Sequence, residues 1–158
     1  LFGDQWEKAS EVFYERFDHI HIQNLKPTKG AQKMLDGVFE QGIFMSVVSN
    51  KRGDYLRKEV WHLGWNKYFS SFIGANDTEN DKPSTEPVEL ALSKCIYKRG
   101  ENIWFVGDAI IDMECAYHSH LTPILLRENP PNPGEFKNYQ PAIHVEDCLA
   151  LSKLIKKM

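Results

Sequence analysis

The stretch Ile103-Trp-Phe-Val-Gly-Asp108-Ala-Ile-Ile-Asp112 decides the fold. Its first four residues are apolar β-formers, which is typical of a strand buried within a parallel sheet. Two carboxylates follow this strand, four residues apart. Because ligands bind beyond the carboxyl ends of the strands in such sheets, Asp108 and Asp112 are the first candidate site residues.

Strands and helices alternate on both sides of this stretch. The hydrophobic patterns predict strands at 43–48, 72–74, 103–106, 123–126 and 142–145, and helices at about 5–23, 30–41, 54–63, 87–98 and 112–119, with a last helix ending at Lys157. Regular alternation of this kind predicts an α/β fold, with a parallel sheet that carries helices on both faces.

Composition narrows the classes of partner. The chain has 158 residues with 19 basic and 22 acidic side chains, and its net charge of −3 argues against nucleic acid and anionic membranes as partners. It contains neither an apolar run of the roughly 20 residues that a membrane span needs nor a secretory signal at its start. Its three cysteines, Cys95, Cys115 and Cys148, are odd in number and far apart, which favours reduced thiols. We therefore expect a cytoplasmic protein that binds a small molecule.

Polar residues also follow the two preceding strands. Ser49 and Asn50 come after the strand at 43–48, and Lys82 lies in the loop after the strand at 72–74. Since the carboxyl ends of parallel strands share one edge of the sheet, these residues should converge with Asp108 and Asp112.

Each candidate residue has an ordinary structural explanation. Ser49 and Asn50 could cap a turn between a strand and a helix, and Lys82 could be a solvated surface lysine. Asp108 could be the N-cap of the next helix, with Asp112 an exposed helical acid. For Cys115, His118 and His120, no accompanying ligand motif supports a zinc site. Only the joint placement of the residues at the strand ends favours function.

Three short motifs resemble a known family. Val47-Val-Ser-Asn-Lys51, Lys82-Pro83 and Val106-Gly-Asp-Ala-Ile-Ile-Asp112 look like the second, third and fourth motifs of the haloacid dehalogenase-like (HAD) hydrolases, in the right order and at similar spacing. The phosphoglycolate phosphatase-like branch is the most similar. His120 departs from the pattern, because it stands where a glycine usually ends the helix after the fourth motif.

The resemblance implies a Mg²⁺-dependent phosphatase that acts on a small phosphorylated metabolite. Ser49 and the backbone N–H of Asn50 would bind the phosphate, with Ser49 and Lys82 as catalytic residues. Mg²⁺ prefers oxygen ligands and takes only one or two protein carboxylates, a role for Asp108 and Asp112. Lys82 would supply the positive charge that the phosphate needs.

The first motif of the family is not found. In the family an Asp-x-Asp on the first strand supplies an aspartate nucleophile and a general acid/base, and no such pattern follows an apolar strand here. The expected organisation is the last part of a helical cap at 1–26 and a HAD-like core at 27–158. The 158-residue chain alone is expected to be inactive. The alternative is an inactive relative that binds phosphate or another protein.

The resemblance implies that the missing strand lies between the strands that end at Ser49 and Asp108. Neighbouring strands lie about 4.8 Å apart, so an empty position would separate these two by roughly 9–10 Å. Three arrangements are open: the position stays empty, a strand from another chain fills it by exchange or oligomerisation, or 44–48 pairs directly with 103–106.

Overall fold

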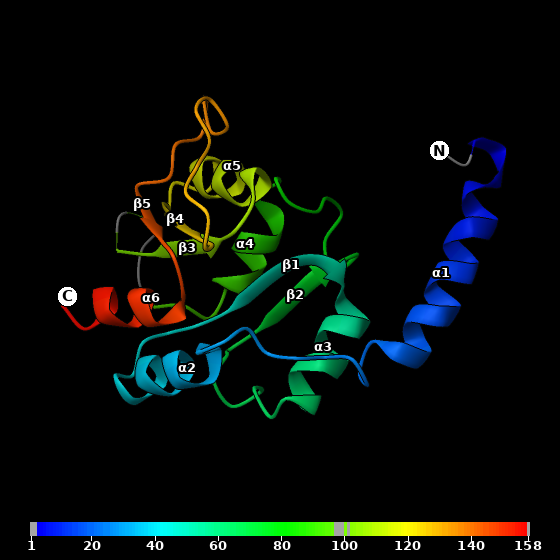
Figure 1. Cartoon of the computed structure of the whole chain (residues 1–158), viewed down its shortest axis with the longest axis horizontal. Coiled ribbons are helices and arrows are strands. Elements are labelled where there is room, and N and C mark those ends of the chain that lie inside the picture. The colour runs from blue at the N-terminus through cyan, green and yellow to red at the C-terminus, as the bar shows by residue number, and fades with distance from the viewer. Residues whose placement is uncertain (1–2, 97–99, 101, 158) are drawn as a thin grey trace.

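Parallel strands and surrounding helices make up most of the computed structural model, which describes residues 3–96, 100 and 102–157 (Figure 1). The described elements, in chain order, are η1 (Gly3–Gln5), α1 (Trp6–Ile20), α2 (Ala31–Glu40), β1 (Val47–Arg52), α3 (Gly53–His62), β2 (Phe72–Ala75), α4 (Glu86–Ala91), β3 (Trp104–Gly107), α5 (Ile110–His118), β4 (Thr122–Leu126), β5 (Ile143–Val145) and α6 (Cys148–Ile155).

The strands form two parallel groups. β1 pairs with β2 in a register that sets Val47 opposite Phe72. β3, β4 and β5 pair in that order, with Trp104 opposite Thr122 and Ile124 opposite Ile143. The strand directions and the helices on both faces confirm the predicted α/β class.

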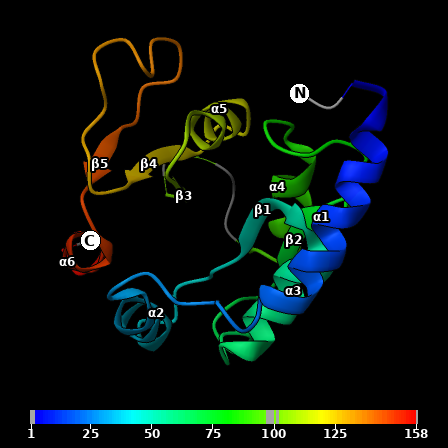
Figure 2. The same ribbon diagram turned by 45° about the vertical axis from the view of Figure 1, so that its right-hand side comes forward.

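Two apolar layers cover the sheets. On one face, Val88 of α4 and Cys115 of α5 pack with Leu121 in a buried cluster. On the other, Met34 of α2 and Leu151 of α6 enclose the inner side chains of the second sheet. Figures 1 and 2 show α4 and α5 on one side and α2 and α6 on the other. Asp147 is the N-cap of α6, and its side chain accepts a hydrogen bond from Ala150 N at 2.7 Å.

β1 and β3 face each other without forming a ladder. Within the described residues, the two sheets have separate hydrogen-bond networks, so direct pairing of 44–48 with 103–106 is excluded. Side chains join the sheets instead, because Val48 of β1 and Phe105 of β3 pack against the same buried cluster of Val88, Cys115 and Leu121. The carboxyl ends of β1 and β3 are therefore held close without any shared backbone bond.

Several predicted boundaries are wrong. β1 spans Val47–Arg52 rather than 43–48, because its partner β2 begins at Phe72, the residue opposite Val47. Ser49 and Asn50 thus lie within the strand. α4 ends at Ala91, well before the predicted Lys98, and the last two residues of that prediction, 97 and 98, lie outside the described residues.

His120 adopts the conformation that its position demands. Its φ of 56° lies in the left-handed region, which glycine adopts more readily than histidine. The turn after α5 therefore keeps its shape although the sequence lacks the expected glycine.

α1 stands away from the sheets and is held near its C-terminal end. Phe17 and His21 contact Tyr55 of α3, with ring centroids 5.1 and 4.9 Å apart. The buried His21 ring lies 3.1 Å from Glu59, which also pairs with Lys51 at the end of β1. We name this contact region, formed by Phe17, His21, Lys51, Tyr55 and Glu59, the α1 joint.

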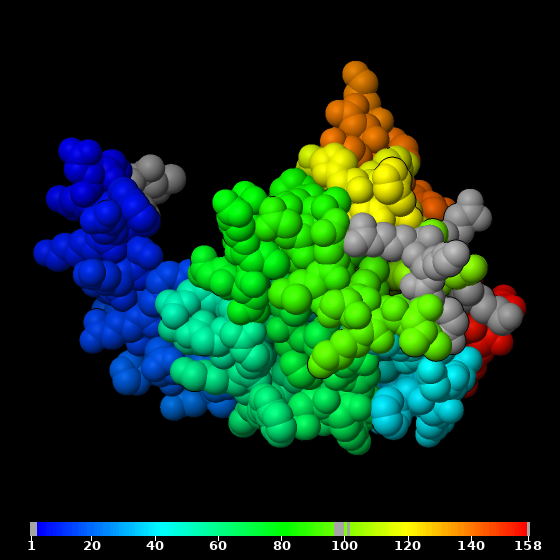
Figure 3. Space-filling view, turned by 180° about the vertical axis from the view of Figure 1, so that it is seen from behind, coloured from blue at the N-terminus to red at the C-terminus, as the bar shows by residue number. Residues whose placement is uncertain are grey.

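The rest of α1 is exposed. Figure 3 shows the helix as an arm beside the body of the molecule. Four large apolar side chains along it are at least 47% exposed, namely Trp6, Val12, Phe13 and Ile20. The division of the chain at about residue 26 stays a prediction.

The cysteines and the helices add two observations. Cys95, Cys115 and Cys148 are all free thiols. In the part of the chain that the structure describes, every helix is too short or too polar to span a bilayer.

Candidate active site

The side chain of Asp112 binds the backbone of the turn that follows β3. It is the third residue of α5, and its Oδ2 accepts hydrogen bonds from the backbone N–H groups of Asp108 and Ala109, both at 3.1 Å. A side chain at Gly107 would force Asp112 to move, because its Cβ would lie 2.3 Å from Cβ of Asp112. Glycine at 107 is therefore a steric requirement of the motif.

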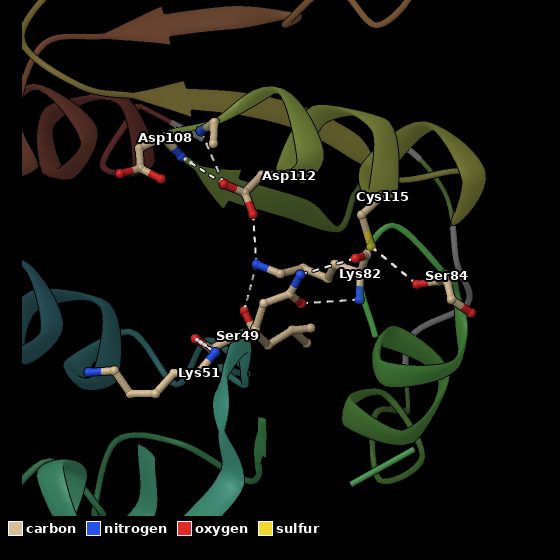
Figure 4. A network of polar contacts seen from close by, with 10 residues as sticks. Ser49, Lys51, Lys82, Ser84, Asp108, Asp112 and Cys115 are labelled. Carbon is tan, nitrogen blue, oxygen red and sulfur yellow. Dashed lines mark hydrogen bonds and ion pairs between the residues drawn. The ribbon is translucent and has the colours of Figure 1, made fainter. Parts of the chain in front are cut away.

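The two carboxylates do not share one side of a helical turn. A helix that began near Asp108 would bring both carboxylates to one side of its first turn, but α5 begins at Ile110. Asp112 is buried and points inward, whereas Asp108 is exposed and its carboxylate points away from Lys82 (Figure 4).

Lys82 reaches between the two sheets. Its Nζ lies 2.7 Å from Oδ1 of Asp112 and 3.3 Å from the carbonyl oxygen of Val48 on β1. The side chains of Lys82 and Asp112 are only 9% and 8% exposed, so this is a buried ion pair and the surface-lysine explanation is wrong. An ammonium group has three protons, and the described residues bind two of them. The third proton is available to a ligand.

Asn50 binds the main chain of Lys82. Its Nδ2 donates to the carbonyl oxygen of Lys82 and its Oδ1 accepts from the backbone N–H, both at 3.1 Å. The carbonyl group that this side chain binds belongs to the Lys82-Pro83 peptide, which is cis.

Ser49 lies beside Asn50 on β1. Its hydroxyl oxygen accepts a hydrogen bond from Lys51 N at 3.1 Å. Among the described residues it donates to no partner, so its proton is available to an anion at the end of the strand.

Asp108 lies near Arg127, the first residue after β4. Two hydrogen bonds from Arg127 to Glu135, both 2.7 Å long, fix the guanidinium group. Glu135 is the main cause of a raised pKa of Arg127, and the negative charge of Asp108 adds to it. A positive charge therefore stands close to Asp108 without neutralising it by direct contact.

The donor set suits a magnesium ion at Asp108 better than at Asp112. Mg²⁺ commonly takes one or two carboxylates and completes its shell with water and phosphate oxygens. Asp108 accepts no hydrogen bond from the described residues, while three hydrogen bonds leave Asp112 one free lone pair, on Oδ1. The described residues include no group of three or more histidine, cysteine or acidic side chains arranged to hold a metal ion.

Cys115 borders the loop that carries Lys82. It donates a hydrogen bond to the carbonyl oxygen of Ser84 at 3.4 Å, and burial raises the pKa of its thiol. A buried thiol with a raised pKa is a poor nucleophile, so Cys115 packs against the site without a chemical role.

Sequence reasoning missed four contributions to this site. They are the carbonyl oxygen of Val48, the side-chain role of Asn50, the Arg127–Glu135 pair, and the need for glycine at 107. The spacing of Gly107 and Asp112 was the one available signal. The other contacts join residues that only the fold brings together.

The sequence profile of the haloacid dehalogenase-like hydrolases matches residues 1–125, which is most of the chain. The chain belongs to the haloacid dehalogenase-like hydrolase family. The predicted family is thereby confirmed.

Individual HAD proteins resemble the chain at modest identity. The pyrophosphatase PpaX of Halalkalibacterium halodurans is 30% identical over 105 residues, which are 65% of this chain and 48% of that protein. The phosphoglycolate phosphatase of Pectobacterium atrosepticum is 32% identical over 106 residues, 65% of this chain and 45% of that protein. The matched region thus spans less than half the length of these two relatives.

A solved structure extends the likeness to almost the whole chain. The HAD-superfamily hydrolase of Ehrlichia chaffeensis is 28% identical, with a TM-score of 0.74, and the match covers 99% of this chain and 71% of that protein. The arrangement of strands described above is therefore that of a HAD hydrolase.

Proposed function

We propose that this chain carries the phosphate- and metal-binding part of a Mg²⁺-dependent phosphatase that acts on a small phosphorylated metabolite. The observation that carries the proposal is the buried ammonium group of Lys82, which lies between the carboxyl ends of β1 and β3 with one proton unused.

Each residue of the site has a task that suits a phosphate monoester. The ester carries close to two negative charges near neutral pH, so binding needs both donors and positive charge. Ser49 would donate its hydroxyl proton and Asn50 its backbone N–H, while Lys82 would stabilise the charge of the transferring group. Asp108 would hold Mg²⁺, which supplies further positive charge at the phosphate when bound.

The nucleophile would come from a strand between β1 and β3. In the family an aspartate on that strand attacks phosphorus, the bond from phosphorus to the ester oxygen breaks and the alcohol leaves, and water then hydrolyses the resulting aspartyl-phosphate to release phosphate. The unpaired facing edges of β1 and β3 are compatible with such a strand. A strand there would end beside Lys82, where the positive charge would favour an ionised aspartate.

A complementation experiment tests this function. The 158-residue chain is mixed with a peptide that carries an apolar strand followed by Asp-x-Asp, and phosphate release from phosphoglycolate and pyrophosphate is measured with and without Mg²⁺. Strand pairing is followed by NMR so that binding of the peptide is known. We expect Mg²⁺-dependent release only with the peptide.

A peptide with asparagine in place of the first aspartate is the control. Equal release with this control, or release from the chain alone, would contradict the aspartyl-phosphate mechanism. A bound peptide without any turnover would favour the alternative, a phosphate-binding module without catalysis.

A further inference from the structure

The side chain of Asn50 binds the backbone of Lys82, which is 32 positions away in the sequence. Its Oδ1 accepts a hydrogen bond from the Lys82 N–H, and its Nδ2 donates one to the Lys82 carbonyl oxygen. One bond would leave the backbone free to rotate about it. Two bonds from one planar amide group fix both the position and the direction of the backbone at Lys82.

The loop that carries Lys82 has no other hydrogen bond from its backbone to β1 in the described part of the chain. Among its side chains, Lys82 also donates to the carbonyl oxygen of Val48 on β1, and Asp77 accepts from Gly74 N on β2. Other side-chain contacts of the loop run within it or to helices, as in the bonds of Asn80 to Glu86 and Cys115 to Ser84. The Asn50 side chain is therefore the link between this backbone and the strand end.

Lys82 needs such a link because its side chain is long and flexible. The ammonium end is held by Asp112, which belongs to the β3 side of the site. The backbone end is held by Asn50, which belongs to the β1 side. Fixing both ends confines the ammonium group to one place between the sheets.

We infer that Asn50 is a positioning residue for Lys82, in addition to any role of its backbone N–H. Its amide group binds Lys82 with one N–H of Nδ2 and one lone pair of Oδ1. The consequence for catalysis rests on the proposed function, but the positioning itself can be measured in the chain alone.

NMR on the ¹⁵N-labelled 158-residue chain tests the inference. We compare Asn50→Ala with the control Asn80→Ala. The control removes a side-chain amide that lies in the loop carrying Lys82 but contacts Glu86 instead of Lys82. In Asn50→Ala, hydrogen exchange of the Lys82 amide should accelerate roughly tenfold, the effect of one lost hydrogen bond. The ion pair with Asp112 slows the exchange of the Lys82 ammonium protons with water. In Asn50→Ala the NMR signal of this ammonium group should broaden or disappear. Asn80→Ala should leave both signals unchanged.

A second variant guards against a general effect on folding. Asn50→Asp retains the acceptor for the Lys82 N–H but loses the donor to its carbonyl oxygen. Its Lys82 amide should remain more protected than in Asn50→Ala. Unchanged exchange and an unchanged ammonium signal in Asn50→Ala would overturn the inference.

Titration with inorganic phosphate and Mg²⁺ separates this inference from the proposed function. If the wild-type chain binds phosphate, Asn50→Ala should weaken binding while Asn80→Ala should not, and equal binding by both variants would overturn the inference. If the wild-type chain binds no phosphate, the proposed function fails, and the Lys82 signals alone decide on the positioning role.

Discussion

Nζ of Lys82 lies 2.7 Å from Oδ1 of Asp112, and each residue comes from a different sheet's end: Lys82 from the loop after β2, Asp112 from the helix after β3. Both side chains are buried. This ion pair joins the two sheets at their common edge, as the buried apolar cluster joins them in the core. It places the charge of Lys82 at that edge.

Asp112→Asn should damage the fold far more than Asp108→Asn. Loss of the charge leaves Lys82 buried without its partner, and breaking a buried pair costs about 3–5 kcal/mol. Asp108 is exposed and accepts no bond from the described residues, so its substitution should change the free energy of unfolding by less than about 0.5 kcal/mol. Urea unfolding followed by tryptophan fluorescence measures both. Equal losses would contradict the assigned roles.

Asp108 should matter for Mg²⁺ binding, although its substitution should have little effect on stability. Asp108→Asn keeps the shape of the side chain but removes the charge, so Mg²⁺ affinity should fall by about tenfold or more. Titration with Mg²⁺, monitored at the Asp108 amide by NMR, measures the change. Asp4→Asn, an exposed aspartate on η1, is the control and should bind Mg²⁺ like the wild type. Retained affinity in Asp108→Asn would remove Asp108 from the metal site.

Substitution of two glycines should have opposite effects. Gly107→Ala forces a Cβ into Asp112, at 2.3 Å from its Cβ, and should destabilise the fold by about 1–3 kcal/mol. Gly37→Ala in α2 meets nothing closer than 3.9 Å and should stabilise the helix by about 0.5–1 kcal/mol. Thermal unfolding of the two variants compares them directly. A neutral Gly107→Ala would show that Asp112 can move without cost.

Acid should weaken the Arg127–Glu135 pair. Hydrogen bonds from Arg127 are the main cause that lowers the pKa of Glu135 from 4.5 to about 2. A lowered pKa in the folded state means that the stabilisation is complete above pH 4.5 and is lost as the pH falls toward 2. The difference in unfolding free energy between wild type and Glu135→Gln should therefore shrink over that range. A difference independent of pH would contradict the ion pair.

Glu59→Ala should loosen the α1 joint. The substitution leaves the buried His21 ring without its partner, which should cost about 1–3 kcal/mol. Trypsin should then cleave faster after Lys29, which follows α1 and is exposed. Lys58→Ala, which removes an exposed ion pair with Asp18, is the control and should leave the cleavage rate unchanged. Equal rates in both variants would show that His21 and Glu59 do not hold the helix.

Much of the fold was predictable because its signals are local. The strand at Trp104–Gly107 and the helix after it follow from a short apolar run and a change of period, and both were found within two residues. β1 was displaced by four residues because the apolar run at 43–48 looks like a strand by itself, whereas the ladder depends on where β2 begins.

The residues of the candidate site could be predicted from the sequence, but the contacts between them could not. Topology alone brought Ser49, Asn50, Lys82 and the two aspartates to one edge of the sheets. Which carboxylate faces inward depends on the residue at which α5 begins. The helix begins at Ile110, two residues after Asp108, and this start directs Asp112 toward Lys82. The α1 joint left no local signal, because His21, the C-cap of α1, and Glu59 in α3 are 38 residues apart.

The attachment of α1 at one end makes the helix a lever. From His21 to Trp6 it spans roughly 22 Å, at about 1.5 Å per residue. A rotation of about 10° at the joint would carry Trp6 through an arc of about 4 Å for the same helix length. Lys51 belongs to the joint and directly follows Asn50 in β1, so a small shift at the strand end is magnified several-fold at the far tip of the arm.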